Sequence, residues 1–505
     1  MTIIHPHNYI QNYEAGVAAL KDSPHDRQLQ HKIVLALARA GALDFALSEY
    51  ERFGLSAIRD NEDIMALNGR LSKDLYLRSS GQEAQKHAAA AARKYELAFQ
   101  NTLGYYSGVN SATMALMADL PEERVMARIE AIEALLPVSL EITPTDHYFV
   151  EATRAECFLL RGAREKAVAA LHAAIDFDPL NYAAHASTLK QFMMITTKRG
   201  DALRWLSDFR PPRSLHYAGH IRLNLTENEE EEMRVTISDA LQQKDVGFGY
   251  GALAAGGDIL FAEGLLEQGA ELHIVLPCTT DLFKRESVIP FGAGWGQRFD
   301  DCLRQASSVR IVTQDADWPD KNMNRISGLS AMGKAILKGQ SLSVEPLQIL
   351  ILKETDSPSY TATHAQDWAD SAFSQFRLSS GAIRSVTLPP SSSDMAISVS
   401  LKTDDQSEAE IYETLEAALV SATLIKRGRK SAQIALHLNI EGEATDKILD
   451  QLLQGGAPQS VLATEAFATV LAAMAADKYK ITYAGQIEHI EESTLRCYTI
   501  QPLIY

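Results

Sequence analysis

Residues 247–258 decide the fold of the middle of the chain, and they read Gly-Phe-Gly-Tyr-Gly-Ala-Leu-Ala-Ala-Gly-Gly-Asp. A helical pattern runs from there to Gln268, and an apolar strand-like run follows at 271–277. Together with the strand-like residues before the turn, this order predicts a βαβ unit. Glycine lets the backbone approach a phosphate closely, and the amides at a helix start stabilise an anion. We therefore expect a ligand site at the carboxyl ends of these strands.

The spacing of the glycines matches neither GxGxxG nor the Walker A motif. The stretch instead resembles the SLOG superfamily, a Rossmann-like group that includes nucleotide hydrolases. The resemblance spans about 213–340 and includes a glycine–histidine pair after the first strand, Gly-Gly-Asp at the helix start and a glutamate on that helix. It implies a nucleotide or nucleotide-derived ligand bound by Gly219, His220, Gly256, Gly257, Asp258 and Glu263, and the glycine pattern of the turn adds Gly249 and Gly251.

Two alternatives stay open for this region. Glycine turns also close tight strand–helix connections without binding a ligand. Asp258 and Glu263 lie about a turn and a half apart on one helix, where they can position a water or a ribose hydroxyl, or can cap and solvate the helix. Because no neighbouring base is identifiable, we assign no catalytic or metal site and no certain cofactor. Hydrolysis of a nucleotide or NAD-derived ligand is the alternative function.

The first 200 residues are helical in pattern, with small and apolar residues three and four apart from about Pro24 to Gly200. The clearest segment, 148–181, has small, aromatic and breaker residues at positions typical of a 34-residue tetratricopeptide repeat. These are Ala155, Phe158, Gly162, Ala167, Leu171, Ala174 and Pro179. Segments 31–58 and 95–99 are weaker copies, and an ordinary helical bundle is the alternative. Residues 30–205 resemble the tetratricopeptide-like regulatory region of apoptosis-signal-regulating kinases, which implies protein partners.

The last third alternates strands and helices, with strands expected at 347–352, 395–400 and 433–438 and a helix at 408–425. The closing segments 460–467, 481–485 and 496–500 resemble the end of class III nucleotidyl cyclases. The positions that the resemblance gives to catalytic groups hold Lys353, Asp394, the short segment 441–447 and Glu491. Lysine cannot ligate Mg²⁺ while it is protonated. We therefore expect a degenerate cyclase without cyclase activity, which forms a homodimer or pairs with an intact cyclase.

Composition limits the classes of partner. The chain has 505 residues and a formal net charge of −17, which argues against nucleic acid and anionic membranes as partners. Its one compact basic cluster, 426–430, is expected to be a solvated turn. The four cysteines are spread without a CxxC pair, which indicates buried thiols in a reducing compartment. No apolar run reaches the length of a membrane span, so a cytoplasmic location is expected.

These observations predict a multidomain protein with boundaries at 1–210, 211–340 and 345–505. The parts are an all-α tetratricopeptide-like array, an α/β Rossmann-like domain of the SLOG type and an α+β cyclase-like domain. Pro211 and Pro212 mark the first boundary. The leading hypothesis for function is a non-catalytic signalling protein with a nucleotide-sensing domain, a protein-binding scaffold and a dimerising pseudo-cyclase.

Overall fold

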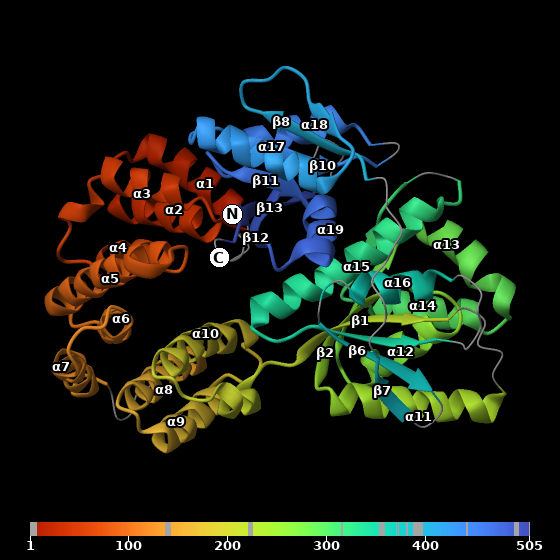
Figure 1. The fold of residues 1–505 in the computed structure, drawn as a ribbon, viewed down its shortest axis with the longest axis horizontal. Helices are drawn as coiled ribbons and strands as arrows, with labels where there is room; N and C mark the ends of the chain where they lie inside the picture. Colours follow the sequence, from red (N-terminus) through yellow and green to blue (C-terminus); the bar gives the residue numbers. More distant parts are fainter. Residues whose placement is uncertain are drawn as a thin grey trace.

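The computed structural model describes residues 8–503, except 137–142, 221–225, 315–316, 353–358, 370, 372, 380–381, 387–396, 441–442 and 489–493. Its first part is an arc of helices (Figure 1). In chain order they are α1 (Tyr9–Asp22), α2 (Arg27–Arg39), α3 (Leu43–Arg52), η1 (Leu55–Ala57), α4 (Glu62–Tyr76), α5 (Gly81–Thr102), α6 (Tyr105–Met117), α7 (Glu122–Glu133), α8 (Pro144–Leu160), α9 (Arg164–Phe177), α10 (Tyr182–Lys198) and η2 (Leu203–Phe209).

Small residues let the helices of this arc pair closely. In α8 and α9, Ala155, Ala167 and Ala174 are fully buried, as the repeat pattern at 148–181 predicts. Thr143 caps α8 by accepting a hydrogen bond from the Asp146 amide at 3.2 Å, and Pro144 stands at the first helical position, where its missing amide costs nothing. The helix pair predicted at 148–181 is therefore present.

The second part contains a seven-stranded sheet in the order β4-β3-β2-β1-β5-β6-β7, parallel except for β7. Its strands are β1 (Arg213–Gly219), β2 (Val246–Gly251), β3 (Glu271–Leu276), β4 (Ser308–Ile311), β5 (Leu347–Ile351), β6 (Ser374–Ser379) and β7 (Ala382–Ser385). Its helices are α11 (Glu227–Gln243), α12 (Gly257–Glu267), α13 (Thr280–Ser287), η3 (Ile289–Phe291), α14 (Trp295–Gln305), α15 (Lys321–Leu342) and α16 (Tyr360–Ala369).

The side chains of β1 point alternately to the two faces of this sheet, and their contacts show which helices cover each face. Leu215 and Tyr217 share a buried cluster with residues of α11 and α12. The intervening side chains face the other way, since Ser214 Oγ donates to the Ala335 carbonyl of α15 at 2.6 Å and the His216 ring stacks on Trp368 of α16. Successive residues of a strand point to opposite faces, so α11 and α12 cover one face and α15 and α16 the other.

One strand belongs to a different sheet from the one we expected. The run 347–352 was predicted to open the cyclase-like domain, yet β5 pairs in parallel with β1, with Leu215 opposite Leu347 and Gly219 opposite Ile351. Every residue of β5 is buried, and a strand buried on both faces fits the centre of a parallel sheet. The first α/β unit therefore extends beyond 340, and the comparison of Lys353 with a cyclase metal ligand is wrong. Lys353, Asp394 and Glu491 lie outside the described residues.

The third part is a six-stranded, mixed sheet in the order β12-β13-β11-β10-β8-β9, in which only β10 and β11 pair in parallel among the described strands. The strands are β8 (Val399–Thr403), β9 (Glu410–Tyr412), β10 (Ile434–Leu438), β11 (Val461–Thr464), β12 (Tyr479–Glu488) and β13 (Thr494–Pro502). The helices are α17 (Leu415–Gly428), α18 (Thr445–Gly455) and α19 (Glu465–Ala475). The helix predicted at 408–425 starts later, because 410–412 form β9.

The helical arc contacts the other two parts of the molecule, as Figure 1 shows. Ala40 and Gly41, after α2, accept hydrogen bonds from Thr499 Oγ1 at 2.8 Å and Gln501 Nε2 at 2.6 Å in β13. At the other end of the arc, the Tyr182 ring of α10 packs edge-to-face on Phe248 of β2. The arc is therefore attached to both sheets.

The arc also contacts itself across its inner side. Lys73 Nζ of α4 donates to Gln191 Oε1 of α10 at 2.7 Å and to Asn110 Oδ1 of α6 at 3.0 Å. Gln191 Nε2 in turn donates to Glu156 Oε1 of α8 at 2.8 Å. Burial lowers the pKa of Lys73 and raises that of Glu156. This polar network joins four helices along the inside of the arc.

Candidate functional site

The backbone of β1 touches the start of α12 at the carboxyl edge of the first sheet. A Cβ on Gly219 would lie 2.3 Å from the Cα of Gly257, and a Cβ on Gly257 would lie 2.5 Å from the Cα of Gly219. The Gly257 amide donates to the His220 carbonyl at 3.2 Å. Neither glycine tolerates a side chain without a shift of backbone, because the obstructing atoms are themselves backbone.

Asp258 braces this contact from inside the protein. Its Oδ1 accepts from the Gly219 amide at 2.7 Å, and its Oδ2 accepts from the Ala254 amide at 3.1 Å. The residue is 6% exposed. Burial raises the pKa of Asp258 to about 6, although both amide hydrogen bonds work in the opposite direction. Asp258 thus fixes the turn through backbone amides at the start of α12.

His220 lies where the chain order of the sheet reverses. From β1 the sheet continues to β2, β3 and β4 on one side and to β5 and β6 on the other. The His220 amide donates to the Ile351 carbonyl of β5 at 3.0 Å, and Thr361 Oγ1 of α16 donates to the Gly219 carbonyl at 3.2 Å. In open α/β sheets, ligands bind beyond the carboxyl ends of the strands at this switch point. The structure therefore brings Gly219, His220, Gly256, Gly257 and Asp258 together there.

The remaining glycines of the predicted site have another role. Gly249 and Gly251 lie within β2 and not in the turn. A Cβ on Gly249 would meet Leu265 Cδ1 at 2.1 Å, and one on Gly251 would meet Tyr217 Cε2 at 2.5 Å. Both therefore make room for packing. Only Gly256 adopts a left-handed backbone in the turn, with φ +105°, directly before α12.

Glu263 belongs to an ion-pair cluster further along α12. Its two oxygens accept from Arg298 Nε and Nη2 of α14, each at 2.7 Å, and Arg234 of α11 lies 2.9 Å from Oε2. Arg298 also contacts Glu230 of α11 at 2.8 Å. The carboxylate therefore ties α11, α12 and α14 together, and two arginines occupy its oxygens. This is a structural contact and not the position of a general base.

Some amides of the turn are already engaged. The Ala254 amide donates to Asp258, the Ala255 amide donates to the Ser287 carbonyl at 3.0 Å, and the Gly257 amide donates to His220. These bonds shape the turn from within. A ligand at this edge would therefore meet the start of α12 and the end of β1, rather than an open cradle of amides.

Sequence reasoning missed a buried ionic cluster around Glu465, the first residue of α19. Lys334 of α15 lies 2.6 Å from its carboxylate, Arg496 of β13 3.2 Å and Arg310 of β4 3.7 Å. Burial opposes ionisation, but the three cations together lower the pKa of Glu465 to about 2. The cluster joins the two sheets. No local signal could reveal it, because its members are up to 186 residues apart in the sequence.

The same junction has a close helix crossing. A Cβ on Gly333 of α15 would overlap the Thr469 carbonyl of α19, and the hydroxyls of Ser330 and Thr469 are 3.2 Å apart. Apolar residues of both helices belong to one buried cluster, including Met332 and Phe467. The two α/β units are therefore packed against each other as one body.

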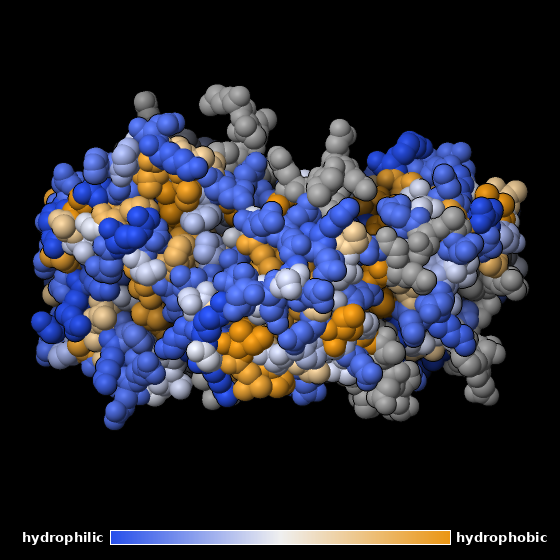
Figure 2. Space-filling model, turned by 90° about the horizontal axis from the view of Figure 1, so that it is seen from above, coloured by the Kyte–Doolittle hydropathy of each residue, from blue (hydrophilic) through white to orange (hydrophobic). Residues whose placement is uncertain are grey.

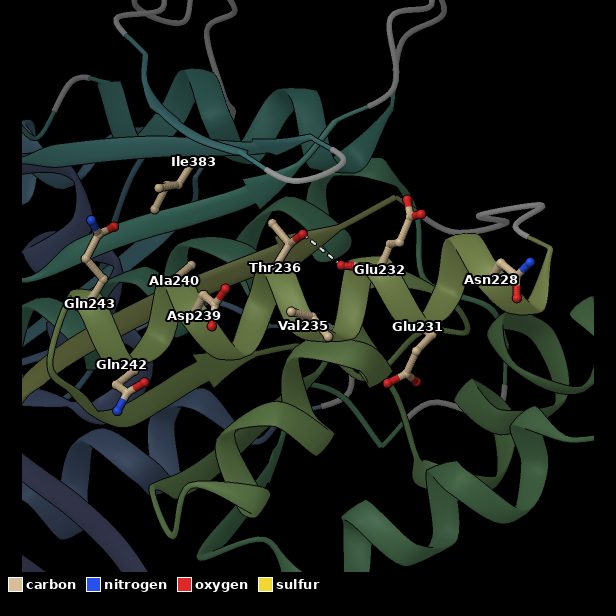
Figure 3. A pocket seen from close by; sticks show the side chains of 10 residues that line it. All are labelled: Asn228, Glu231, Glu232, Val235, Thr236, Asp239, Ala240, Gln242, Gln243 and Ile383. Atoms are coloured by element: carbon tan, nitrogen blue, oxygen red, sulfur yellow. Dashed lines mark hydrogen bonds between the residues drawn. The ribbon is translucent and has the colours of Figure 1, made fainter.

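A large surface groove lies away from the glycine turn. It runs between α11 and the edge strand β7 and has a volume of about 980 Å³ (Figure 3). Ile383 of β7 stands on one side, and α11 supplies the acidic residues Glu231, Glu232 and Asp239. Its carboxylates disfavour a phosphate, so this groove does not extend the predicted anion site.

Comparison with known proteins gives one family match. The tetratricopeptide repeats-sensor family (TPR-S) matches residues 10–115. Tetratricopeptide-type helical repeats therefore form the N-terminal part of the chain. No curated protein matches the sequence.

Two solved structures are similar to part of the chain. One is TTC0263, a thermophilic TPR protein of Thermus thermophilus, with 15% identity over 37% of this chain and 91% of that chain and a TM-score of 0.30. The other is a mutant O-GlcNAc transferase of Thermobaculum terrenum, with 10% identity over 57% of this chain and 45% of that chain and a TM-score of 0.19. Because both TM-scores are below 0.5, neither supports an inference about function. Within the described ranges, no helix is long and apolar enough to cross a membrane.

Proposed function

We propose that this chain is a non-catalytic regulatory protein that binds a nucleotide or nucleotide-derived ligand at the junction of β1 and α12. The observation that carries the proposal is the backbone contact of Gly219 with Gly257 at the switch point of the sheet. This contact brings the strand end and the helix start together at one edge of the sheet, where a phosphate could meet both. The partial positive charge at the start of α12 favours such a group, and it is opposed by the Asp258 carboxylate, which accepts hydrogen bonds from the Gly219 and Ala254 amides.

The helical arc supports a regulatory role, because tetratricopeptide repeats commonly bind proteins. Its inner side is occupied by the network of Lys73, Gln191 and Glu156. We infer that a protein partner binds the outer helices or opens this network. Since α10 contacts β2 and the turn after α2 contacts β13, a shift of either sheet would reach the arc. A ligand at β1 can in this way change what the arc binds.

We further propose that the carboxy-terminal unit is a pairing module without cyclase activity, because its closing segments resemble class III cyclases while the shortened segment 441–447 has no counterpart of their catalytic groups. Its partner would be a second copy of the chain or an intact cyclase. The alternative of a nucleotide hydrolase loses one of its two candidate residues, because Glu263 is held by Arg298 and Arg234. We therefore place hydrolysis second.

Isothermal calorimetry with ATP, NAD and ADP-ribose tests ligand binding by the full chain. We expect heat of binding for the wild type and its loss in Gly257→Trp, whose side chain would force β1 and the start of α12 apart. Gly294→Trp is the matched control, because Gly294 has an ordinary helical backbone and open space at its Cβ. His220→Ala gives a smaller perturbation at the same edge. Absence of heat for all three ligands, or equal heat for Gly257→Trp and the wild type, would contradict the proposal.

A further inference from the structure

The basic cluster at 426–430 is only partly used inside the protein. Lys426 Nζ donates to the carbonyls of Ala432 and Gln459, each at 3.0 Å, and Arg429 Nη2 contacts Asp404 at 2.6 Å. Arg427 and Lys430, in contrast, are exposed. The cluster is therefore more than a solvated turn, since two of its cations hold the chain and two face solvent.

These exposed cations border an apolar groove, which we name the α17 groove. It has a volume of about 560 Å³, and its lining includes Leu419, Thr423, Arg427, Lys430, Tyr479 and Pro502. Lys426 adds a third cation and Asp44 the one carboxylate among the described lining residues. Beside it on α17, Val420 is 51% exposed and Leu424 59% exposed. The upper side of the molecule, where α17 lies in Figure 1, is mainly hydrophilic with separate hydrophobic patches (Figure 2).

Such a groove selects an amphipathic helix with acidic residues beside its apolar ones. The chain carries a helix of this kind. The exposed side of α11 has Glu231, Glu232 and Asp239 around Val235, which is 52% exposed. We name these four residues the acidic face of α11. No ion pair within the described part of the chain involves its three carboxylates.

We propose that the chain assembles head to tail, with the acidic face of α11 of one copy seated in the α17 groove of a second copy. The charges are complementary: the three carboxylates would meet the exposed cations Arg427 and Lys430, and Val235 would meet the apolar floor. Helix α11 lies at the bottom of Figure 1 and α17 at the top. One contact therefore leaves a free α11 on one copy and a free groove on the other. Such a heterologous contact makes an open chain or a ring rather than a two-fold dimer.

Sedimentation velocity of the full chain across a concentration series tests this. We expect a species that grows beyond the dimer with concentration and shrinks as salt is raised. Two variants each break one surface: Arg427→Glu/Lys430→Glu in the groove and Glu231→Lys/Glu232→Lys on the acidic face. Each alone should weaken association at least about tenfold, because like charges then meet. Lys32→Glu/Lys86→Glu is the matched control, with exposed lysines on α2 and α5, and should associate as the wild type does.

Mixing the two variants is the decisive step. The acidic face of the first fits the groove of the second, and the reversed face of the second fits the reversed groove of the first. The mixture should therefore regain the large species that neither variant forms alone. A wild type that stays monomeric at every concentration overturns the proposal. So does a dimer that Glu231→Lys/Glu232→Lys leaves intact, since that result indicates a two-fold contact elsewhere. Neither result bears on nucleotide binding at β1, which calorimetry reports separately.

Discussion

Two strand-to-helix connections in this molecule each have a buried carboxylate at the start of the helix, but the pKa values of the two carboxylates are shifted in opposite directions. After β2, a turn leads into α12 with Asp258 in its first turn, and after β11 the chain enters α19 directly at Glu465. Both carboxylates are nearly buried, at 6% and 8% exposure. The pKa of Asp258 is raised to about 6 by burial, whereas that of Glu465 is lowered to about 2 by Lys334, Arg496 and Arg310.

The two pKa values differ because the carboxylates have different partners, and not because one is more buried than the other. Asp258 accepts hydrogen bonds from two backbone amides, which only partly compensate the burial of its charge. Glu465 has three cations from three elements, so its connection is locked between two sheets. We infer that the first connection is a site that can respond to a ligand or to pH, and that the second is a fixed joint.

Glu465→Gln should have the largest effect. It leaves Lys334 buried without its carboxylate, and removing one partner of a buried ion pair costs about 3–5 kcal/mol. We expect the free energy of unfolding to fall by that amount in a denaturant titration. Glu263→Gln is the comparison, because Glu263 pairs with arginines of α11 and α14 within the first unit and not with the second sheet. If Glu465→Gln unfolds like the wild type, the joint does not hold the two sheets together.

Gly257→Ala comes next. The added Cβ would lie 2.5 Å from the Gly219 Cα, which requires a backbone shift and should cost about 1–3 kcal/mol. Gly294→Ala, with open space around its Cβ, should leave the free energy of unfolding nearly unchanged. Equal stability of the two variants would show that β1 and α12 are not in close contact.

Asp258→Asn should show a smaller, pH-dependent effect. The pKa of Asp258 is raised above its ordinary value of 3.8, so folding of the wild type takes up a proton between about pH 4 and 6. Its stability relative to Asp258→Asn is then greatest below pH 4 and falls by about 1–3 kcal/mol as pH rises through 6. Denaturant titrations at pH 4, 5, 6 and 7 measure this, and a constant difference would contradict the assigned environment.

Arg429→Ala should have the smallest effect. Its pairs with Asp404 and Asp405 lie at the surface, and exposed ion pairs contribute about 0–1 kcal/mol. A larger loss of thermal stability would show that this end of α17 depends on its charges.

Local patterns predicted much of the secondary structure. The helix pair expected at 148–181 is present as α8 and α9, and β1 starts directly after Pro211 and Pro212. The local sequence patterns could not predict which sheet each strand joins or the order of the strands within it. The apolar run of β5 fits either sheet, and only its pairing with β1 assigns it. Likewise, Gly249 and Gly251 are glycines because of Leu265 and Tyr217, which lie on other elements and give no sequence signal.

The central claim is that the edge of β1 and α12 responds to a ligand, while the joint at Glu465 does not. Hydrogen–deuterium exchange of the full chain with and without NAD tests it most directly, in parallel with ATP. We predict slower exchange of the amides at 219–220 and 256–258 with nucleotide, and unchanged exchange at 464–467. Protection at 464–467 with none at 256–258, or no change anywhere under either nucleotide, would contradict the account.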